Sequence, residues 1–381
     1  MRYRPELDVI RGICMAAVFL YHSYFFEFGW TGVQAFFVLS GYLITDVLLR
    51  DKQLSTSTSR YFINFYIRRA LRIFPVYFAY LLLAYFIGRI TRAGWIGSLV
   101  STNIEQSAAY LVSYTFNFRL IQVPGQSRFL EHLWSLSIEE QFYWVWPLIV
   151  FVLPRKRILN ACIVLVLLGP AVRLLELIAY PALSVKSTAE LLIYLSPLSH
   201  FDAFALGALL NFASESVLVE RLVQRASRIV PPLFVLVSAC MLLAGKLKGY
   251  STAGSSLGWP ARLPYFYAST WGYTLLNFLF FVLIANVSSW KSLIESTILR
   301  GLGKISYGFY IFHLPILTLA FVLVNPAVSA IALKAELGAI AFVLTWVVSE
   351  ISFKYLETPF LNMKKFFTTK RSEIVSEHLL S

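Results

Sequence analysis

The first apolar segment of the chain carries polar residues that are costly to place in a membrane. Arg11 and His22 both lie in the stretch "RPELDVIRGICMAAVFLYH". In a helix they would lie on nearly the same face, roughly 16 Å apart along the axis. Ionisable side chains inside a membrane usually face other helices or a water-filled cavity, so both residues are candidates for function. The alternatives are that Arg11 extends to lipid phosphates and that His22 only contacts a neighbouring helix.

A second group of candidates is basic. The run "YIRRALRIFP" contains Arg68, Arg69 and Arg72. Because Arg69 and Arg72 are three residues apart, a helix presents them on one face, where they could bind a phosphate or pyrophosphate through charge-assisted hydrogen bonds. The alternative is that these charges only set the orientation of the protein in the membrane. The sequence is compatible with either role.

Two adjacent acids occur in the stretch "EHLWSLSIEEQFYW". His132, Ser135 and Glu139 fall on one face of the expected helix, and Ser137 and Glu140 fall on another. A carboxylate here could stabilise the helix N-terminus, or it could hold a histidine of another helix in the tautomer that catalysis requires. Because the acids lie several residues inside the apolar segment, the sequence favours a role in a pocket.

Other polar residues in the apolar segments are expected to be structural. Ser40 in "FFVLSGYLIT" has no local base that could activate it as a nucleophile. His200 and His313 are interpreted as buried histidines with satisfied hydrogen bonds. The cysteines show no paired spacing, so we expect neither a disulfide framework nor a metal site. These cysteines are Cys14, Cys162 and Cys240.

The chain has the composition of a membrane protein. Of its 381 residues, 58% are hydrophobic and 14% are charged, and the mean hydropathy is +0.68. The absence of a Walker loop, an HExxH motif and a GxSxG motif argues against an ATP-driven pump and the common hydrolases. Anchoring at anionic membrane lipid explains the net charge of +13, so no nucleic-acid partner is expected.

We predict an all-α protein with about ten transmembrane helices in one bundle. A hydrocarbon core of about 30 Å requires roughly 20 mostly apolar residues per helix. With ten crossings and both termini in the cytoplasm, most of the 33 Lys and Arg residues fall on the cytoplasmic side. The predicted spans lie near 8–27, 31–49, 71–90, 133–153, 158–178, 198–213, 229–245, 268–287, 303–324 and 330–353.

Three further segments need separate interpretations. Residues 104–118, "IEQSAAYLVSYTFNF", could form a re-entrant or an interfacial helix. The loop 246–267 is rich in aromatic residues, which favours a membrane interface, with a sugar-binding surface as the alternative. Residues 1–363 form the predicted membrane domain, and residues 364–381 are predicted to be a short polar tail in the cytoplasm.

Seven stretches follow one another in a characteristic order: "RPELDVIRG…H", "FFVLSGYLIT", "RRALRIFP", "HLWSLSIEEQFYWVWP", "FDAFALGALL", "SYGFYIFHLP" and "YLETPF". Together they resemble acyltransferase family 3. Members of this family are bacterial integral-membrane proteins that O-acylate surface polysaccharides, peptidoglycan, Nod factors or macrolides. The resemblance covers almost the whole chain and implies a multi-pass protein of the bacterial cytoplasmic (inner) membrane.

The resemblance also implies roles for individual residues. The family's pattern of a basic residue followed by a histidine in the first helix falls on Arg11 and His22, and its Arg-x-x-Arg pattern falls on Arg69 and Arg72. His22 would act as a general base on a sugar hydroxyl or as a transient acyl carrier, oriented by a carboxylate. The candidate catalytic residues are thus His22, Glu139 and Glu140, and the candidate donor-binding residues are Arg11, Arg68, Arg69 and Arg72.

The implied donor is a cytoplasmic acyl-coenzyme A, by default acetyl-coenzyme A, and no permanently bound cofactor is expected. The implied acceptor is a glycan, such as an exopolysaccharide or O-antigen, that can be lipid-linked. Some relatives carry an appended esterase domain of the SGNH type; none is expected here, so a separate extracytoplasmic partner protein could complete the transfer. The alternatives are a proton-coupled transporter or flippase that uses the same charges, and acylation of a small molecule such as a macrolide.

Overall fold

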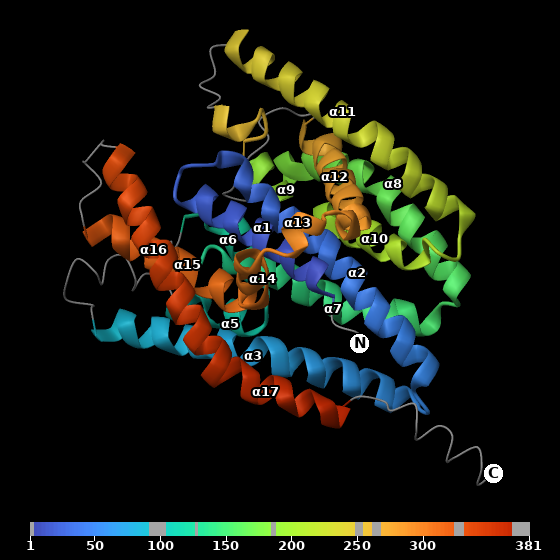
Figure 1. The fold of residues 1–381 in the computed structure, drawn as a ribbon, viewed down its shortest axis with the longest axis horizontal. Helices are drawn as coiled ribbons and strands as arrows, with labels where there is room; N and C mark the ends of the chain where they lie inside the picture. Colours follow the sequence, from blue (N-terminus) through green and yellow to red (C-terminus); the bar gives the residue numbers. More distant parts are fainter. Residues whose placement is uncertain are drawn as a thin grey trace.

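The computed structural model is a helical bundle. Every regular element among the described residues is a helix or a helical turn, and no strand occurs there, which confirms the all-α prediction. In Figure 1, three helix ends point to the lower right: the start of α1, the end of α2 and the start of α3. The structure describes residues 4–90, 104–125, 129–183, 188–247, 254–260, 268–323 and 331–367.

The predicted apolar segments form the long helices, and shorter helices connect or flank them. The helices that match predicted spans are α1 (Pro5–His22), α2 (Thr31–Leu54), α3 (Thr58–Ile90), α7 (Leu133–Val152), α8 (Arg155–Ala179), α10 (Phe201–Leu209), α11 (Val217–Leu247), α12 (Tyr273–Asn286), α15 (Ser306–Leu323) and α16 (Ile331–Ser352). The shorter ones are α5 (Ile104–Val112), α6 (Phe116–Gln122), α9 (Ala189–Leu195), α13 (Lys291–Ile294), α14 (Thr297–Lys304) and α17 (Thr358–Met363).

In the described part of the chain, fewer helices than the ten predicted are long and apolar enough to cross a membrane. Within the described ranges, six helices are long and apolar enough to cross a membrane, and eight crossings result if each of two bent helix pairs counts as one. Helix α1 is not among them because it carries Glu6, Asp8 and Arg11 within its 18 residues. Helix α7 is not among them either. Ten crossings and cytoplasmic termini therefore stay predictions.

Helices α2 and α3 extend beyond the second and third predicted spans. Helix α2 continues to Leu54 and α3 begins at Thr58, so most of the polar run between the two spans is helical. Tyr61 and Phe65 on this run are fully buried, and the Tyr61 hydroxyl donates a hydrogen bond to the Pro147 carbonyl of α7 at 3.1 Å. Packing of these aromatic side chains extends the helix beyond its apolar part, since tertiary contacts override local polarity.

Three other expectations can be compared with the structure. Residues 104–118 form parts of α5 and α6, which are too short to cross a membrane. In the loop 246–267, Trp259 is buried and donates to Ser238 at 2.7 Å, so it is a core residue, while 248–253 and 261–267 lie outside the described residues. The predicted tail begins with a helical turn, Lys364–Phe367, that packs on α3, and residues 368–381 lie outside the described part.

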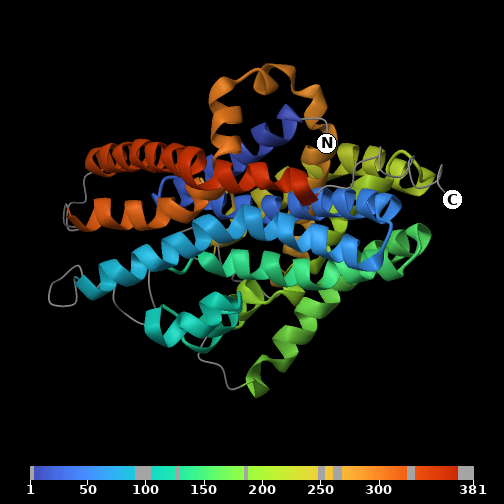
Figure 2. The same cartoon turned by 90° about the horizontal axis from the view of Figure 1, so that it is seen from below.

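Sharp bends occur at the starts of two predicted spans, 198–213 and 303–324. Helices α9 and α10 meet at 71°, and α14 and α15 meet at 82°. The second bend lets α14 lie across the first half of α1, which Figure 2 shows from a second direction. The approach is so close that a Cβ atom added to Gly303 would lie 1.8 Å from the Asp8 carbonyl oxygen, and one added to Gly12 would lie 2.2 Å from that of Leu299. Only glycine fits at this crossing.

Replacing Gly303 with alanine should therefore destabilise the fold. The added methyl group meets backbone rather than a movable side chain, and overpacking of this kind costs typically about 1–3 kcal/mol. We expect a lower thermal unfolding midpoint for the detergent-solubilised variant. Gly254→Ala is the control, because a Cβ atom there meets nothing within 4 Å. Equal midpoints for the two variants would contradict the close crossing of α1 and α14.

Candidate active site

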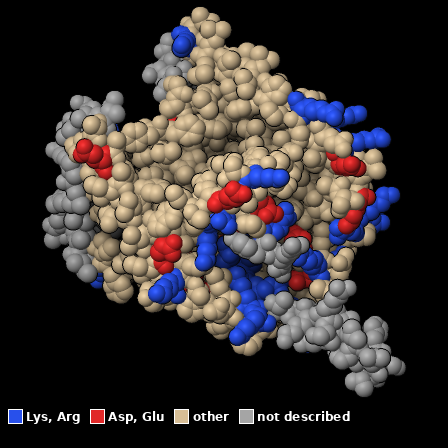
Figure 3. Space-filling model, in the orientation of Figure 1, with Lys and Arg blue, Asp and Glu red and all other residues tan. Residues whose placement is uncertain are grey.

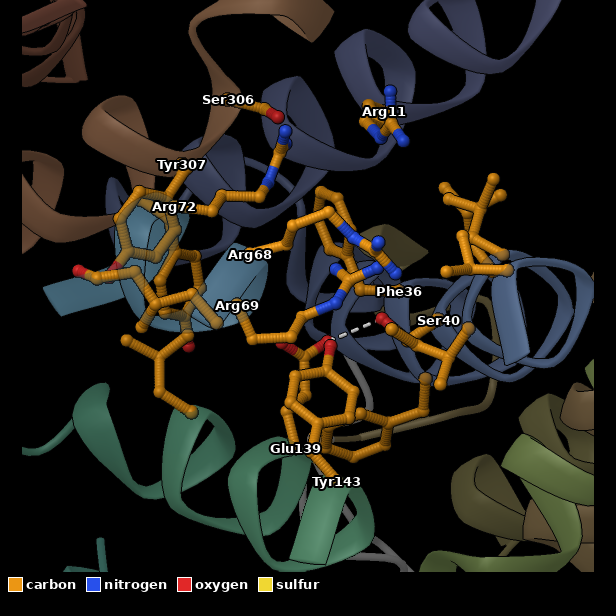
Figure 4. A pocket seen from close by; sticks show the side chains of 18 of the residues that line it. Arg11, Phe36, Ser40, Arg68, Arg69, Arg72, Glu139, Tyr143, Ser306 and Tyr307 are labelled. Atoms are coloured by element: carbon orange, nitrogen blue, oxygen red, sulfur yellow. Dashed lines mark hydrogen bonds between the residues drawn. The ribbon is translucent and has the colours of Figure 1, made fainter. Parts of the chain in front are cut away.

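A cavity of about 670 Å³ lies between α1, α2, α3, α7 and α15. It is lined largely by apolar side chains of α2, such as Val33, Phe36 and Leu43, with charged groups concentrated at one end. Figure 4 shows the arginine side chains of α1 and α3 reaching into the same space from different directions. The charged lining residues are six bases, Arg11, Arg50, Arg68, Arg69, Arg72 and Lys364, and two acids, Asp51 and Glu139.

Three of the arginines are neutralised by neighbouring carboxylates. Arg11 donates to Asp8, one turn earlier on α1, at 2.5 Å. Arg50 is paired with Asp46, one turn earlier on α2. Arg68 is paired with Asp51 at the end of α2 and also donates to the Phe367 carbonyl at 2.7 Å. These contacts hold the three guanidinium groups in place, but they leave little of their charge for a ligand.

Arg69 and Arg72 are different. Among the described residues neither has a carboxylate within 4 Å, although both line the cavity. The guanidinium of Arg69 instead lies over the rings of Phe65 and Tyr143, at 5.7 and 5.6 Å from their centroids. The predicted shared face of Arg69 and Arg72 is confirmed. Guanidinium groups without a paired carboxylate in a part-enclosed cavity are suited to bind a multiply charged anion.

A serine and a glutamate meet at the floor of this basic end. The Ser40 hydroxyl of α2 donates to Glu139 of α7 at 2.8 Å, drawn as the dashed line in Figure 4. Sequence reasoning missed this pair because the residues are 99 positions apart. In this arrangement Ser40 anchors the glutamate beneath the arginines. A carboxylate next to the hydroxyl does not by itself form a nucleophile with an oriented third group.

Removing the Ser40 hydroxyl tests this assignment. We expect Ser40→Ala to retain acyl transfer, with a loss of about tenfold or less, because one hydrogen bond contributes about 0.5–1.5 kcal/mol. The measurement is the rate of acyl transfer per folded molecule. If Ser40 were the nucleophile, Ser40→Ala would instead abolish activity.

The inner wall of the cavity contains a pair of hydroxyl groups. The Tyr310 hydroxyl of α15 donates to the His132 carbonyl at 2.8 Å and is 2.6 Å from the Ser135 hydroxyl, which can therefore donate to it. Both residues line the cavity. Behind them lie His22 at the end of α1 and His313 of α15, with 3.1 Å between His22 Nδ1 and His313 Nε2. His22 itself is not a lining residue; it is joined to this wall through His313, whose ring centroid lies 5.3 Å from that of Tyr310.

The structure brings together most of the residues singled out from sequence, but not all of them. Arg11, Arg68, Arg69, Arg72 and Glu139 share the cavity, whereas the buried Glu140 is not among its lining residues. No hydrogen bond of the described residues joins either glutamate to His22. The expected orienting carboxylate is thus absent there, because α7 directs Glu139 to α2, and an imidazole takes its place.

His313 is the residue that sequence reasoning undervalued. It was interpreted as structural, yet it contacts His22. The spacing in the sequence did contain a signal for this contact. Tyr310 and His313 are three residues apart and share a helix face, as do His132 and Ser135. Each of these four side chains faces the same cluster.

Two other buried polar residues, His200 and Asp202, have their hydrogen bonds satisfied, as expected for His200. Its Nδ1 accepts from Gln34 at 3.0 Å and its Nε2 donates to the Tyr194 carbonyl at 3.0 Å. Asp202 forms a fully buried ion pair with Arg173 of α8, at 2.9 Å. Breaking such a pair typically costs about 3–5 kcal/mol, because the remaining charge is left without a partner.

A family model described as an acyltransferase domain matches residues 4–350. The chain belongs to this acyltransferase family. It is 29% identical to the peptidoglycan O-acetyltransferase OatA of Listeria monocytogenes, over 97% of this chain and 58% of the relative.

Two further relatives of this chain also carry names of O-acetyltransferases. It is 27% identical to the putative peptidoglycan O-acetyltransferase YrhL of Bacillus subtilis, over 94% of this chain and 55% of the relative. It is 26% identical to the O-acetyltransferase OatA of Staphylococcus aureus, over 94% of this chain and 57% of the relative. The chain thus spans little more than half the length of these relatives. No solved structure matches it.

Proposed function

We propose that this protein is a membrane-bound O-acyltransferase that moves an acyl group, in the simplest case acetyl, from acyl-coenzyme A to a hydroxyl of a glycan. The observation that carries the proposal is the pair of cavity arginines, Arg69 and Arg72, that have no carboxylate partner among the described residues. Coenzyme A carries a pyrophosphate and a further phosphate, which match a cluster of guanidinium groups. Membership of an acyltransferase family supports the reaction class.

The distribution of charge supports a donor that arrives from the cytoplasm. On the face seen in Figure 3, most Lys and Arg side chains lie along the right side and at the lower centre, which includes the region where α2 ends and α3 begins in Figure 1. Positive charge marks the cytoplasmic side of a membrane protein. The phosphates would be held at this end by Arg69 and Arg72, with the paired Arg11 and Arg68 next to them. The thioester arm would extend along the apolar wall of α2 toward Ser135 and Tyr310.

The acceptor chemistry falls to His22. A neutral imidazole can take the proton of a sugar hydroxyl as it attacks the thioester carbonyl, and this kind of general base catalysis typically contributes about 10²- to 10⁴-fold. Because relatives are named peptidoglycan O-acetyltransferases, a cell-wall or surface glycan is the preferred acceptor. It would reach His22 from the extracytoplasmic side, alone or presented by a partner protein in the bacterial cytoplasmic membrane.

Purified protein in liposomes tests the proposal. With radiolabelled acetyl-coenzyme A outside and a soluble glycan fragment inside, we expect label in the glycan and release of free coenzyme A. Proton or glycan movement without consumption of the donor would instead favour a transporter that uses the same charges. In cells, mass spectrometry of the surface glycans with and without the protein should show a difference of one acyl group, which names both the acyl group and the acceptor.

A further inference from the structure

Three imidazole rings form a cluster behind the cavity wall. They come from the end of α1, the residue before α7 and the middle of α15: His22, His132 and His313. The ring centroids of His22 and His313 are 4.9 Å apart, and those of His132 and His313 are 5.5 Å apart. His132 and His313 are buried, whereas His22 is half-buried. The hydrogen bonds around these rings determine which nitrogens carry protons.

His313 can be assigned first. Its Nδ1 lies 2.6 Å from the Tyr310 carbonyl oxygen, which can only accept a hydrogen bond, so Nδ1 carries the proton. A neutral imidazole has one protonated nitrogen, and a charged one would be costly at this fully buried position. His313 Nε2 is therefore an acceptor with a free lone pair.

The assignment of His22 follows from two independent neighbours. Its Nδ1 lies 3.0 Å from the Val18 carbonyl oxygen and 3.1 Å from His313 Nε2, and both of these atoms are acceptors. Nδ1 must then carry the proton of His22 and share it between them. His22 Nε2 has the lone pair, and it has no hydrogen-bond partner among the described residues. A catalytic base needs this tautomer with an available nitrogen.

The position of His313 is itself fixed by α15 and α7. Pro315 has no backbone N–H, so it leaves the Ile311 carbonyl without its usual partner within α15. His132 Nε2 donates to that carbonyl at 3.1 Å and thereby ties the start of α7 to the turn of α15 that carries His313. On the other side, Phe309 packs edge-to-face on Phe19 of α1, with centroids 5.9 Å apart. Contacts on both sides hold His313 against His22.

We propose that His313 is a positioning residue that acts through His22, in the place where a carboxylate would be expected. This rests on the proposed function. The acceptor hydroxyl gives its proton to His22 Nε2 as its oxygen bonds to the acyl carbon and the bond from that carbon to sulfur breaks. The imidazolium then returns the Nε2 proton to the thiolate of coenzyme A. Throughout, His313 Nε2 accepts the hydrogen bond of His22 Nδ1–H, which keeps the reactive nitrogen facing away from His313.

Substitutions at residue 313 separate positioning from a purely structural role. His313→Leu removes the acceptor, His313→Met leaves only a weakly accepting sulfur, and the side-chain oxygen of His313→Gln can replace the acceptor. We expect kcat to fall about 10²-fold or more in Leu and Met and to recover at least tenfold in Gln, with KM for the donor unchanged in all three. The control is His200→Leu, an equally buried histidine without contact to His22, which should lower stability but not kcat per folded molecule.

Two results would overturn the role of His313. One is an equal loss of kcat in the Gln, Leu and Met variants, and the other is full kcat in Leu or Met. A test independent of the acceptor is ¹⁵N NMR of histidine-labelled protein, with His22→Gln used to assign the signals. We expect His22 to be protonated at Nδ1 only, and a proton on Nε2 would reject the proposal for any substrate. Absence of transfer by the unchanged protein would reject the proposed function instead.

Discussion

Replacing His22 with glutamine should stop acyl transfer without preventing donor binding. The side-chain amide of glutamine can donate the hydrogen bond that His22 Nδ1 gives to Val18 and His313. It cannot accept and release a proton at neutral pH. The expected loss in kcat is about 10²- to 10⁴-fold, the usual contribution of a general base. The measurement is transfer of radiolabelled acetyl groups to a glycan fragment, together with binding of acetyl-coenzyme A to the same preparation.

The variant must be shown to be folded before the loss is interpreted. His200→Gln provides the matched control, because His200 is a buried histidine in a separate hydrogen-bonded network with Gln34. We expect this control to transfer acyl groups at the normal rate per folded molecule. Normal transfer by His22→Gln would remove His22 from the mechanism, whatever its effect on abundance.

The second large effect is expected at the basic end of the cavity. Replacing both Arg69 and Arg72 with glutamine should raise KM for acetyl-coenzyme A about 10²-fold or more, since hydrogen bonds to charged groups contribute about 1.5–3 kcal/mol each. The reason is that these two guanidinium groups have no carboxylate partner in the described structure and face the cavity. The measurement is KM at two salt concentrations, and the salt dependence should weaken in the variant.

A substrate comparison isolates the phosphate contacts. A small acetyl thioester without phosphates should be used equally poorly by the double variant and by the unchanged protein. Arg60→Gln is the control, because Arg60 is an exposed arginine on the same helix that does not line the cavity. If the control and the double variant raise KM equally, a general effect of surface charge explains the result and the phosphate site is wrong.

Local spacing was sufficient to predict several features of the candidate site. Arg69 and Arg72 were expected on one helix face, and both line the same cavity. His132 and Ser135 were likewise expected on one face, and both contact Tyr310. Each prediction concerns residues within one turn of a single helix, where the geometry of the backbone decides which side chains are neighbours. The same reasoning identified the apolar segments that form the long helices.

Contacts between helices were beyond such reasoning. His313 lies against His22 because the chain bends by 82° between α14 and α15 and because Gly303 lets α14 lie directly on α1. Neither the bend nor the crossing has a periodic signature in the sequence. In the same way, Glu139 was expected to orient a histidine, but the relative rotation of α2 and α7 brings it to Ser40. Such pairings depend on packing between distant parts of the chain.

Under the proposed function, the uninterrupted course of α1 would limit the acyl donors that this site can use. The helix is continuous from Pro5 to His22, so the distance from Arg11 to His22 is fixed at roughly 16 Å. A thioester on a truncated arm would stop short of the imidazole while its phosphates were still held by the arginines. An elongated arm would have to fold back on itself. Donors of either kind should therefore bind normally and still react slowly. The fixed length of α1 would thus determine which donor lengths react.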